Sequence, residues 1–215
     1  MTGGALQNTP TALSEQTRIE TEQETQQVDF NMAYETVLGK EAGFSDDPRD
    51  SGGQTKYGIT EAVARAFGYT GPMNLLGLDQ AKAIYRSRYW DALQLDQVAG
   101  LAPAVAGELF DTAVNQGTDQ AATFLQRLLN VLNKEGSWYP DVTADGRIGP
   151  MTIAALREYV HRRGAEGQVV LLRALNALQG AFYVELAERR AKDEAFVYGW
   201  LLNRVGISTA AGGKA

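Results

Sequence analysis

The chain of 215 residues contains no cysteine and only one histidine, His161. The absence of cysteine excludes disulfide bridges and thiolate chemistry, and a zinc site is not expected with a single histidine. A Ser-His-Asp triad would have to use His161. That residue stands beside two arginines at an expected helix end, where a basic side chain is a typical capping residue. We therefore expect neither a metal nor a cofactor.

The sequence also lacks long apolar runs and any concentration of basic residues. No stretch of 18 apolar residues occurs, so we expect no membrane insertion. The formal net charge is −6, which argues against a nucleic-acid partner, because nucleic-acid binding needs a concentrated basic face. The first 20 residues lack the basic and apolar parts of a signal peptide. The expected location is the cytoplasm of the producing cell until release.

Four segments differ in composition along the chain. Residues 1–31 are rich in Thr, Gln and Glu and are expected to form a mobile arm. A helical pattern starts at Met32, and a soft boundary at Gly117 separates a domain over 32–117 from one over 118–206. Residues 207–215 are small and polar, as in a flexible tail. No internal repeat is apparent, and we expect a monomer.

Hydrophobic spacing predicts a mainly α fold with one small β-hairpin or loop over 44–59. Proline at the start and glycine after the end mark the clearest helix, 103–116. The helices expected from such signals cover residues 60–68, 79–90, 103–116, 119–133, 150–163, 167–191 and 194–204.

The segment GKEAGFSDDPRDSGGQTKYGIT, residues 39–60, carries the strongest chemical signal. Glu41 follows a helical pattern, Asp50 stands on the return limb of the expected hairpin, and Thr55 follows it. Two carboxyl groups facing across a gap can cleave a glycosidic bond, one as a protonated acid and one as a base or nucleophile. Apolar neighbours of Glu41 would raise its pKa. Turn formation alone also explains most of these residue types, and Glu41 could be a solvated helix end.

This segment closely resembles the signature E-G-G-Y-[ST]-x-D-P-x-D-x-G-G-x-T-x-[YF]-G-I of glycoside hydrolase family 108. YRSRYWDAL (85–93) and LFDTAVNQG (109–117) resemble further elements of that family. The resemblance implies a lysozyme-like fold and N-acetylmuramidase activity, with Glu41 as the catalytic glutamate. The spacing of Glu41, Asp50 and Thr55 also resembles the triad of phage-type lysozymes, which has one more residue before its threonine. Ala42 and Phe44 replace the more usual Gly and Tyr.

Four side chains are candidates to line a sugar-binding cleft. Sugar rings pack on aromatic planes while their hydroxyls bind amides, and aromatic residues at helical spacing are also common in cores. The candidates are Tyr57, Tyr89, Trp90 and Asn115.

Residues 141–149, DVTADGRIG, resemble two different motifs. They mimic the opening of a calcium-binding EF-hand loop, but Thr152 stands where the bidentate glutamate is needed, so we reject calcium. They resemble more closely the D-G-x-x-G-x-x-T-x-x-A-L core of peptidoglycan-binding domains, and YGWLLNR (198–204) resembles the end of such a domain. Asp145, Arg147 and Trp200 are the candidate wall-binding residues.

The resemblances together imply a lysozyme-like muramidase domain followed by a helical peptidoglycan-binding domain. Such a protein would cut the β-1,4 bond between N-acetylmuramic acid and N-acetylglucosamine. The setting they favour is a phage endolysin that reaches the periplasmic wall through a holin. Two alternatives stay open: a lytic transglycosylase, which needs no second carboxylate, and a non-catalytic wall-binding or virion structural protein.

Overall fold

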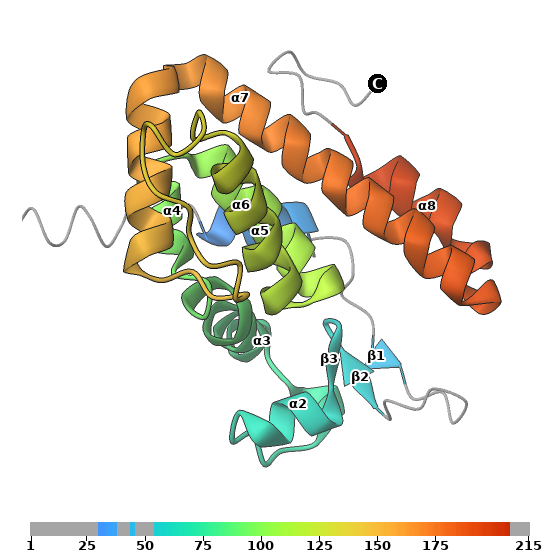
Figure 1. Cartoon of the computed structure of the whole chain (residues 1–215). Coiled ribbons are helices and arrows are strands. Elements are labelled where there is room, and N and C mark those ends of the chain that lie inside the picture. The colour runs from blue at the N-terminus through green and yellow to red at the C-terminus, as the bar shows by residue number, and fades with distance from the viewer. Residues whose placement is uncertain (1–29, 38–43, 46–53, 207–215) are drawn as a thin grey trace, which may run out of the picture.

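The computed structural model describes residues 30–37, 44–45 and 54–206, and it is mainly helical, as predicted (Figure 1). Three two-residue strands form a small antiparallel sheet at one end of the molecule, beside the short helix α2 (Glu61–Ala66). The strands are β1 (Phe44–Ser45), β2 (Thr55–Lys56) and β3 (Ile59–Thr60). The sheet therefore has one strand more than the hairpin expected from the sequence.

The remaining helices form the body of the molecule, in which α5 and α6 lie centrally (Figure 1). Residues 30–37 are helical as well. The body consists of α3 (Leu78–Tyr85), η2 (Arg86–Asp91), α4 (Leu95–Ala99), α5 (Pro103–Gln116), α6 (Thr118–Val131), α7 (Pro150–Arg189) and α8 (Glu194–Arg204), with short 3₁₀ turns at Met73–Leu75 and Ala191–Asp193. Helix α8 packs along the C-terminal part of α7.

Local signals account for several helix ends. The Thr60 side chain accepts a hydrogen bond from the Val63 backbone N–H at 3.4 Å and so caps α2. Pro103 occupies the first turn of α5, where its missing N–H has no cost. Gly117 follows α5 with a φ of 95°, a conformation that side chains disfavour. These boundaries confirm the helix predicted over 103–116.

Helix α7 is continuous except at Gly164, whose φ of 60° and ψ of −148° are not helical. The two helices expected over 150–163 and 167–191 are therefore halves of one element with a glycine kink. Residues 86–90, expected as part of an ordinary helix over 79–90, belong to a π-helical turn (Arg86–Asp91) instead. Its wider turn rotates the side chains that follow relative to an α-helix, which bears on the aromatic residues discussed below.

One hydrophobic core runs through the described part of the chain on both sides of Gly117. At one end Phe30 packs against Trp90 and Phe110, with ring centroids 5.5 and 5.9 Å apart. At the other end leucines of α6 pack against leucines of α7, and both groups belong to the same cluster. The two halves therefore stabilise each other.

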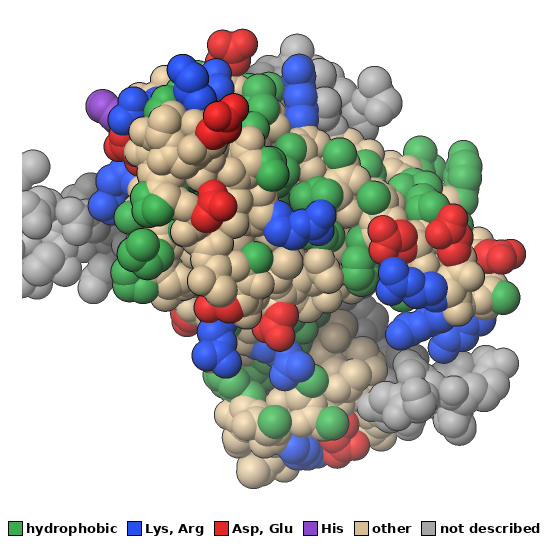
Figure 2. Space-filling view, viewed as in Figure 1, with side chains coloured by type: hydrophobic (Ala, Val, Ile, Leu, Met, Phe, Trp, Pro, Cys, Tyr) green, Lys and Arg blue, Asp and Glu red, His purple; other side chains and the backbone are tan. Residues whose placement is uncertain are grey.

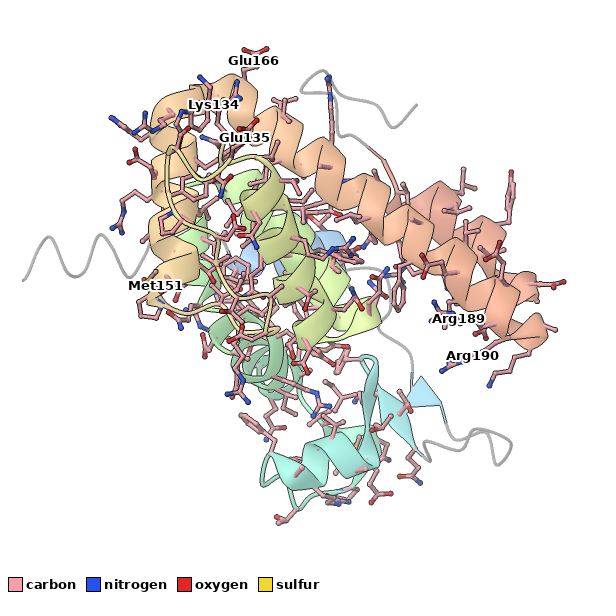
Figure 3. All side chains as sticks on the ribbon, in the orientation of Figure 1. Lys134, Glu135, Met151, Glu166, Arg189 and Arg190 are labelled. Atoms are coloured by element: carbon pink, nitrogen blue, oxygen red, sulfur yellow. The ribbon has the colours of Figure 1, made fainter. Side chains whose placement is uncertain are left out.

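Polar side chains on one face of α6 and just beyond its end hold the loop over 132–149. Gln126, which is 1% exposed, donates to the Asp145 carboxylate at 2.9 Å and accepts from the Gly146 N–H at 3.1 Å. Asn130 exchanges two hydrogen bonds of 2.8 Å with the Val142 backbone. The loop is thus fixed by hydrogen bonds rather than by regular structure. Lys134 and Glu135, at one end of the molecule in Figure 3, take positive φ values of 56° and 57° in its first turn.

Helix α7 contains one 18-residue window with a mean hydropathy of 1.3, which by length and composition alone would suffice to cross a membrane. A third of that window is buried inside the protein, and α7 packs against α5 and α6. Apolar residues of α7 therefore form part of the hydrophobic core.

Candidate active site

The sheet presents a tight turn toward the helical body. Strands β2 and β3 pair antiparallel, and the chain reverses through Tyr57 (φ 52°) and Gly58 (φ 70°). The Tyr85 hydroxyl of α3 donates to the Tyr57 carbonyl at 3.2 Å and ties this turn to the body. Thr55, in β2, pairs with Ser45 on one side and with Thr60 on the other. It is half-buried beside the turn.

Glu41 and Asp50 lie outside the residues that the structure describes. Their roles therefore stay predictions, and so does the role of Thr55 relative to them. Described residues stand close to both in sequence. Val37 precedes Glu41 by four positions at the end of the first helix, and Gln54 follows Asp50 by four positions before β2.

A pocket of about 190 Å³ lies between the sheet turn and the helical body. Val37, from the helix before the signature, and Gly58, near the end of the signature, line it, and residues of α3, η2, α5 and α8 complete it. Its described lining is Val37, Gly58, Tyr85, Tyr89, Val114, Asn115 and Arg204.

A second pocket of about 230 Å³ shares Tyr89 and Val114 with the first. Arg88, Gly117 and Thr118 are among its other lining residues. Each pocket is smaller than the roughly 300–1,000 Å³ of a site that encloses a whole small ligand. Two hollows that share lining residues suit successive units of a polymer such as a glycan strand.

Two of the four sugar-binding candidates, Tyr89 and Asn115, line the first pocket together. The Tyr89 ring packs on the Tyr85 ring with centroids 5.5 Å apart, and Tyr89 is partly exposed. The Asn115 amide donates to the Asp111 backbone carbonyl at 2.8 Å and to the Asp111 carboxylate at 3.1 Å. Tyr57 contributes its backbone to the turn, and its ring is half-buried.

Trp90 lies elsewhere, in the core rather than along the pocket. It is 1% exposed, packs against Phe30 and Phe110, and donates through Nε1 to the Asp96 carboxylate at 2.7 Å. A sugar cannot reach it in this arrangement, so its assignment as a sugar-binding residue is corrected to a core residue. In the π-helical turn, Tyr89 and Trp90 point to different surroundings although they are adjacent in the sequence.

Sequence reasoning missed Arg204, which lines the pocket, and two carboxylates behind it: Asp111, which binds Asn115 and Arg204, and Glu108, which interacts with Asp111. Burial raises the pKa of Glu108 to about 8, and the nearby Asp111 carboxylate adds to the increase. Asp111 lies four residues before Asn115 in LFDTAVNQG, so its helical spacing was a usable signal. Arg204 is 93 residues from Asp111, and no local pattern indicated their pairing.

The candidate wall-binding residues lie in two separate places. Asp145 is exposed and shapes its own turn, because its Oδ1 accepts from Gln126 and, at 3.0 Å, from the Arg147 N–H. The bond from Gln126 lowers the pKa of Asp145. Arg147 is exposed. Trp200 lies on α8. Its ring stacks on Phe196 with centroids 6.0 Å apart and packs against Tyr183 with centroids 5.2 Å apart.

Exposed apolar side chains gather over α7 and α8 (Figure 2). Phe196, Tyr198 and Leu202 are the most exposed of those on α8. Among the residues that the structure describes, no group of three or more His, Asp or Glu side chains is placed to hold a metal ion.

Comparison with known proteins supports the reading of both halves. Residues 34–117 match the model of the family described as glycosyl hydrolase 108, and residues 120–205 match the family described as a predicted peptidoglycan domain. No curated protein matches the chain.

Among solved structures, SagA of Brucella abortus is similar in fold. It is 24% identical with a TM-score of 0.53, over 85% of this chain and 98% of that one. Because its identity is low, this likeness bears on the fold alone. The family matches carry more: residues 34–117 are similar to glycosyl hydrolase 108 and residues 120–205 to a peptidoglycan-binding domain, and this combination supports a peptidoglycan hydrolase.

Proposed function

We propose that the chain is an N-acetylmuramidase that hydrolyses the β-1,4 bond between N-acetylmuramic acid and N-acetylglucosamine. The observation that carries this proposal is the pocket lined by Tyr89 and Asn115, which Val37, before the signature, and Gly58, within it, also line. The second hollow, which shares Tyr89, leaves room for a further unit of a strand of alternating sugars. The match of residues 34–117 to a glycosyl hydrolase family supports glycosidic cleavage at this pocket.

In this proposal Glu41 is the general acid and Asp50 the base. Glu41 donates its proton to the glycosidic oxygen as the C–O bond breaks, while Asp50 takes a proton from the attacking water. Thr55 helps to hold that water. Inversion of this kind requires the two carboxyl groups to lie roughly 6.5–9.5 Å apart, whereas about 5 Å would indicate a covalent, retaining route.

Mass spectrometry of the fragments released from purified cell wall tests the proposal. We expect fragments ending in reducing N-acetylmuramic acid. Reducing N-acetylglucosamine ends would place the cut at the other glycosidic bond, and anhydro-muramic ends would identify a lytic transglycosylase. Absence of any release by folded protein would favour a wall-binding or virion structural role.

The second half is proposed to hold the enzyme on the wall. Its surface offers the 145–147 turn and the aromatic group of Trp200 and Phe196 for contact with the polymer. The proposed setting is a phage endolysin, monomeric and kept in the cytoplasm of the producing cell until a holin gives it access to the periplasmic wall. Lysis of cells only after the membrane is permeabilised would support this setting.

A further inference from the structure

Asp111 of α5 connects three helices at the edge of the first pocket. Its Oδ2 accepts from the Gln179 side chain of α7 at 2.7 Å, and Gln179 is fully buried. Its Oδ1 accepts from Asn115 at 3.1 Å and forms an ion pair with Arg204 Nη1 of α8 at 3.5 Å. One carboxylate thus holds two side chains that line the pocket, Asn115 and Arg204.

Arg204 belongs to the last turn of α8, inside the region that matches the peptidoglycan domain. The other described residues of the pocket, from Val37 to Asn115, lie inside the region that matches the glycosyl hydrolase. The pocket is therefore composite: the second half of the chain supplies a cation to a hollow that the first half builds.

The guanidinium of Arg204 keeps binding capacity for a ligand. Its side chain is 26% exposed, and its ion pair with Asp111 uses one nitrogen at a long distance of 3.5 Å. Asp111 also shares its charge with Asn115 and Gln179, which weakens its hold on Arg204. An arginine carries five N–H donors in a planar fork that matches a carboxylate.

Among the described residues, the charged side chains that line the two pockets are of one sign, with the Asp111 carboxylate behind Arg204 and Asn115. Among their described lining residues the charged side chains are Arg88 and Arg204, and no carboxylate is among them. A site of this kind favours an anionic substrate group. A peptidoglycan strand has such groups: the lactyl carboxylate of muramic acid where the peptide is absent, and the carboxylates of the stem peptide where it is present.

We propose that Arg204 binds a carboxylate of the glycan strand and so selects muramic-acid-containing strands over neutral ones. The inference rests on the proposed function, because it assigns a substrate group to the same pocket. It makes α8 part of the hydrolytic site as well as of the wall-binding half.

The test compares soluble strands that differ in charge. One is peptide-free, with lactyl carboxylates; the second is the same strand with those carboxylates converted to neutral methyl amides; the third retains its stem peptides. Arg204→Gln should lower kcat/KM on a carboxylate-bearing strand about 10- to 100-fold, the range for a charge-assisted contact. On the neutral strand it should change kcat/KM by less than about twofold. Arg204→Lys keeps the positive charge but loses the planar guanidinium, so its kcat/KM on the carboxylate-bearing strand should lie between those of the parent and Arg204→Gln.

The substrate that shows the loss identifies the source of the carboxylate. A loss on peptide-free strands assigns Arg204 to the lactyl group, and a loss confined to peptide-bearing strands assigns it to the stem. Arg189→Gln is the matched control, since Arg189 lies at the far end of α7 (Figure 3), where it pairs with Glu185 and lines neither pocket. The kcat/KM of this control should match that of the parent on all three strands.

Equal losses on the charged and neutral strands, or no loss on any strand, would overturn the proposal. If the parent cleaves none of them, the proposed function fails. Arg204 is then judged by calorimetric binding of the peptide-free strand to parent and Arg204→Gln protein. Tighter binding of the strand to the parent than to Arg204→Gln protein would support a carboxylate site at Arg204, and equal binding would contradict it.

Discussion

Glu108 is a carboxyl group that the fold largely encloses. Within the described part of the chain its Oε1 is buried without a hydrogen-bond partner, and burial beside Asp111 raises its pKa from 4.5 to about 8. The folded state therefore binds this proton more tightly than the unfolded state does. Its contribution to stability is complete below about pH 4.5 and is lost as the pH rises through about 8.

Glu108→Gln should consequently gain stability relative to the parent as the pH rises. The amide stays neutral, so the variant lacks the cost of ionising a buried group. One pKa unit corresponds to about 1.4 kcal/mol, or roughly 3–6 °C in Tm for a chain of this size. Thermal unfolding at pH 5 and pH 8 should show a difference in Tm between variant and parent that widens by at least about 3 °C. A constant difference, as expected for the exposed control Glu166→Gln (Figure 3), would contradict the shifted pKa.

Individual site residues differ in how far local sequence could identify them. Asn115 was recognisable because it stands in a motif, and Tyr89 because it stands beside a tryptophan in another. The same reasoning misplaced Trp90, since spacing does not show which of two adjacent aromatics a π-helical turn buries. Arg204 could not be found, because its relation to Asp111 depends on the packing of α8 against the body.

Helices were the most predictable elements, because their ends carry chemical signals. Pro103, Gly117 and Thr60 mark boundaries that the structure confirms. The short helix α4 was missed, since five residues give too little hydrophobic periodicity to recognise. Residues 134–149, between the helices expected over 119–133 and 150–163, do lack regular structure, although α6 ends two residues earlier than expected. The hydrogen bonds of Gln126 and Asn130 that hold this loop depend on the tertiary arrangement.

The kink of α7 gives an element-scale prediction. Gly164 has backbone angles that are nearly restricted to glycine, so Gly164→Ala should lower the free energy of unfolding by about 1–3 kcal/mol. Gly107 is the matched control. It lies within α5, where an added Cβ meets nothing within 4 Å, and Gly107→Ala should raise stability by up to about 1 kcal/mol. Chemical denaturation measures both changes. Equal effects of the two substitutions would show that the kink is not maintained by Gly164.

At the scale of the whole molecule, the two family regions share one core. Removal of residues 118–215 would expose α5, which packs against both α6 and α7. The truncated chain should therefore aggregate or lose its cooperative unfolding transition. Size-exclusion chromatography with thermal unfolding checks this expectation. A monomeric fragment that unfolds cooperatively would instead show that residues up to Gly117 form an independent domain.

Wall binding is better tested by surface substitutions that leave this core intact. Arg147→Ala and Trp200→Ala should each reduce the fraction of protein that pellets with insoluble wall, while cleavage of short soluble strands changes less. A tethered binding surface raises the local concentration of the cleft only on a solid substrate. Arg127→Ala, an exposed change on α6, serves as the control. Parent-like pelleting by folded Arg147→Ala and Trp200→Ala proteins would remove the wall-binding role from these residues.

The central claim is that Glu41 supplies the proton for glycosidic cleavage, and its most direct test is turnover of purified wall by Glu41→Gln. The substitution keeps the size of the side chain but removes its transferable proton, so we expect a rate at least about 100-fold below the parent. The matched control is Glu35→Gln, on the preceding helix, where Glu35 is an exposed residue paired with Lys82. It should retain the parent rate, and circular dichroism should show both variants folded. Release of reducing ends by Glu41→Gln at a rate close to that of the parent would contradict the assignment.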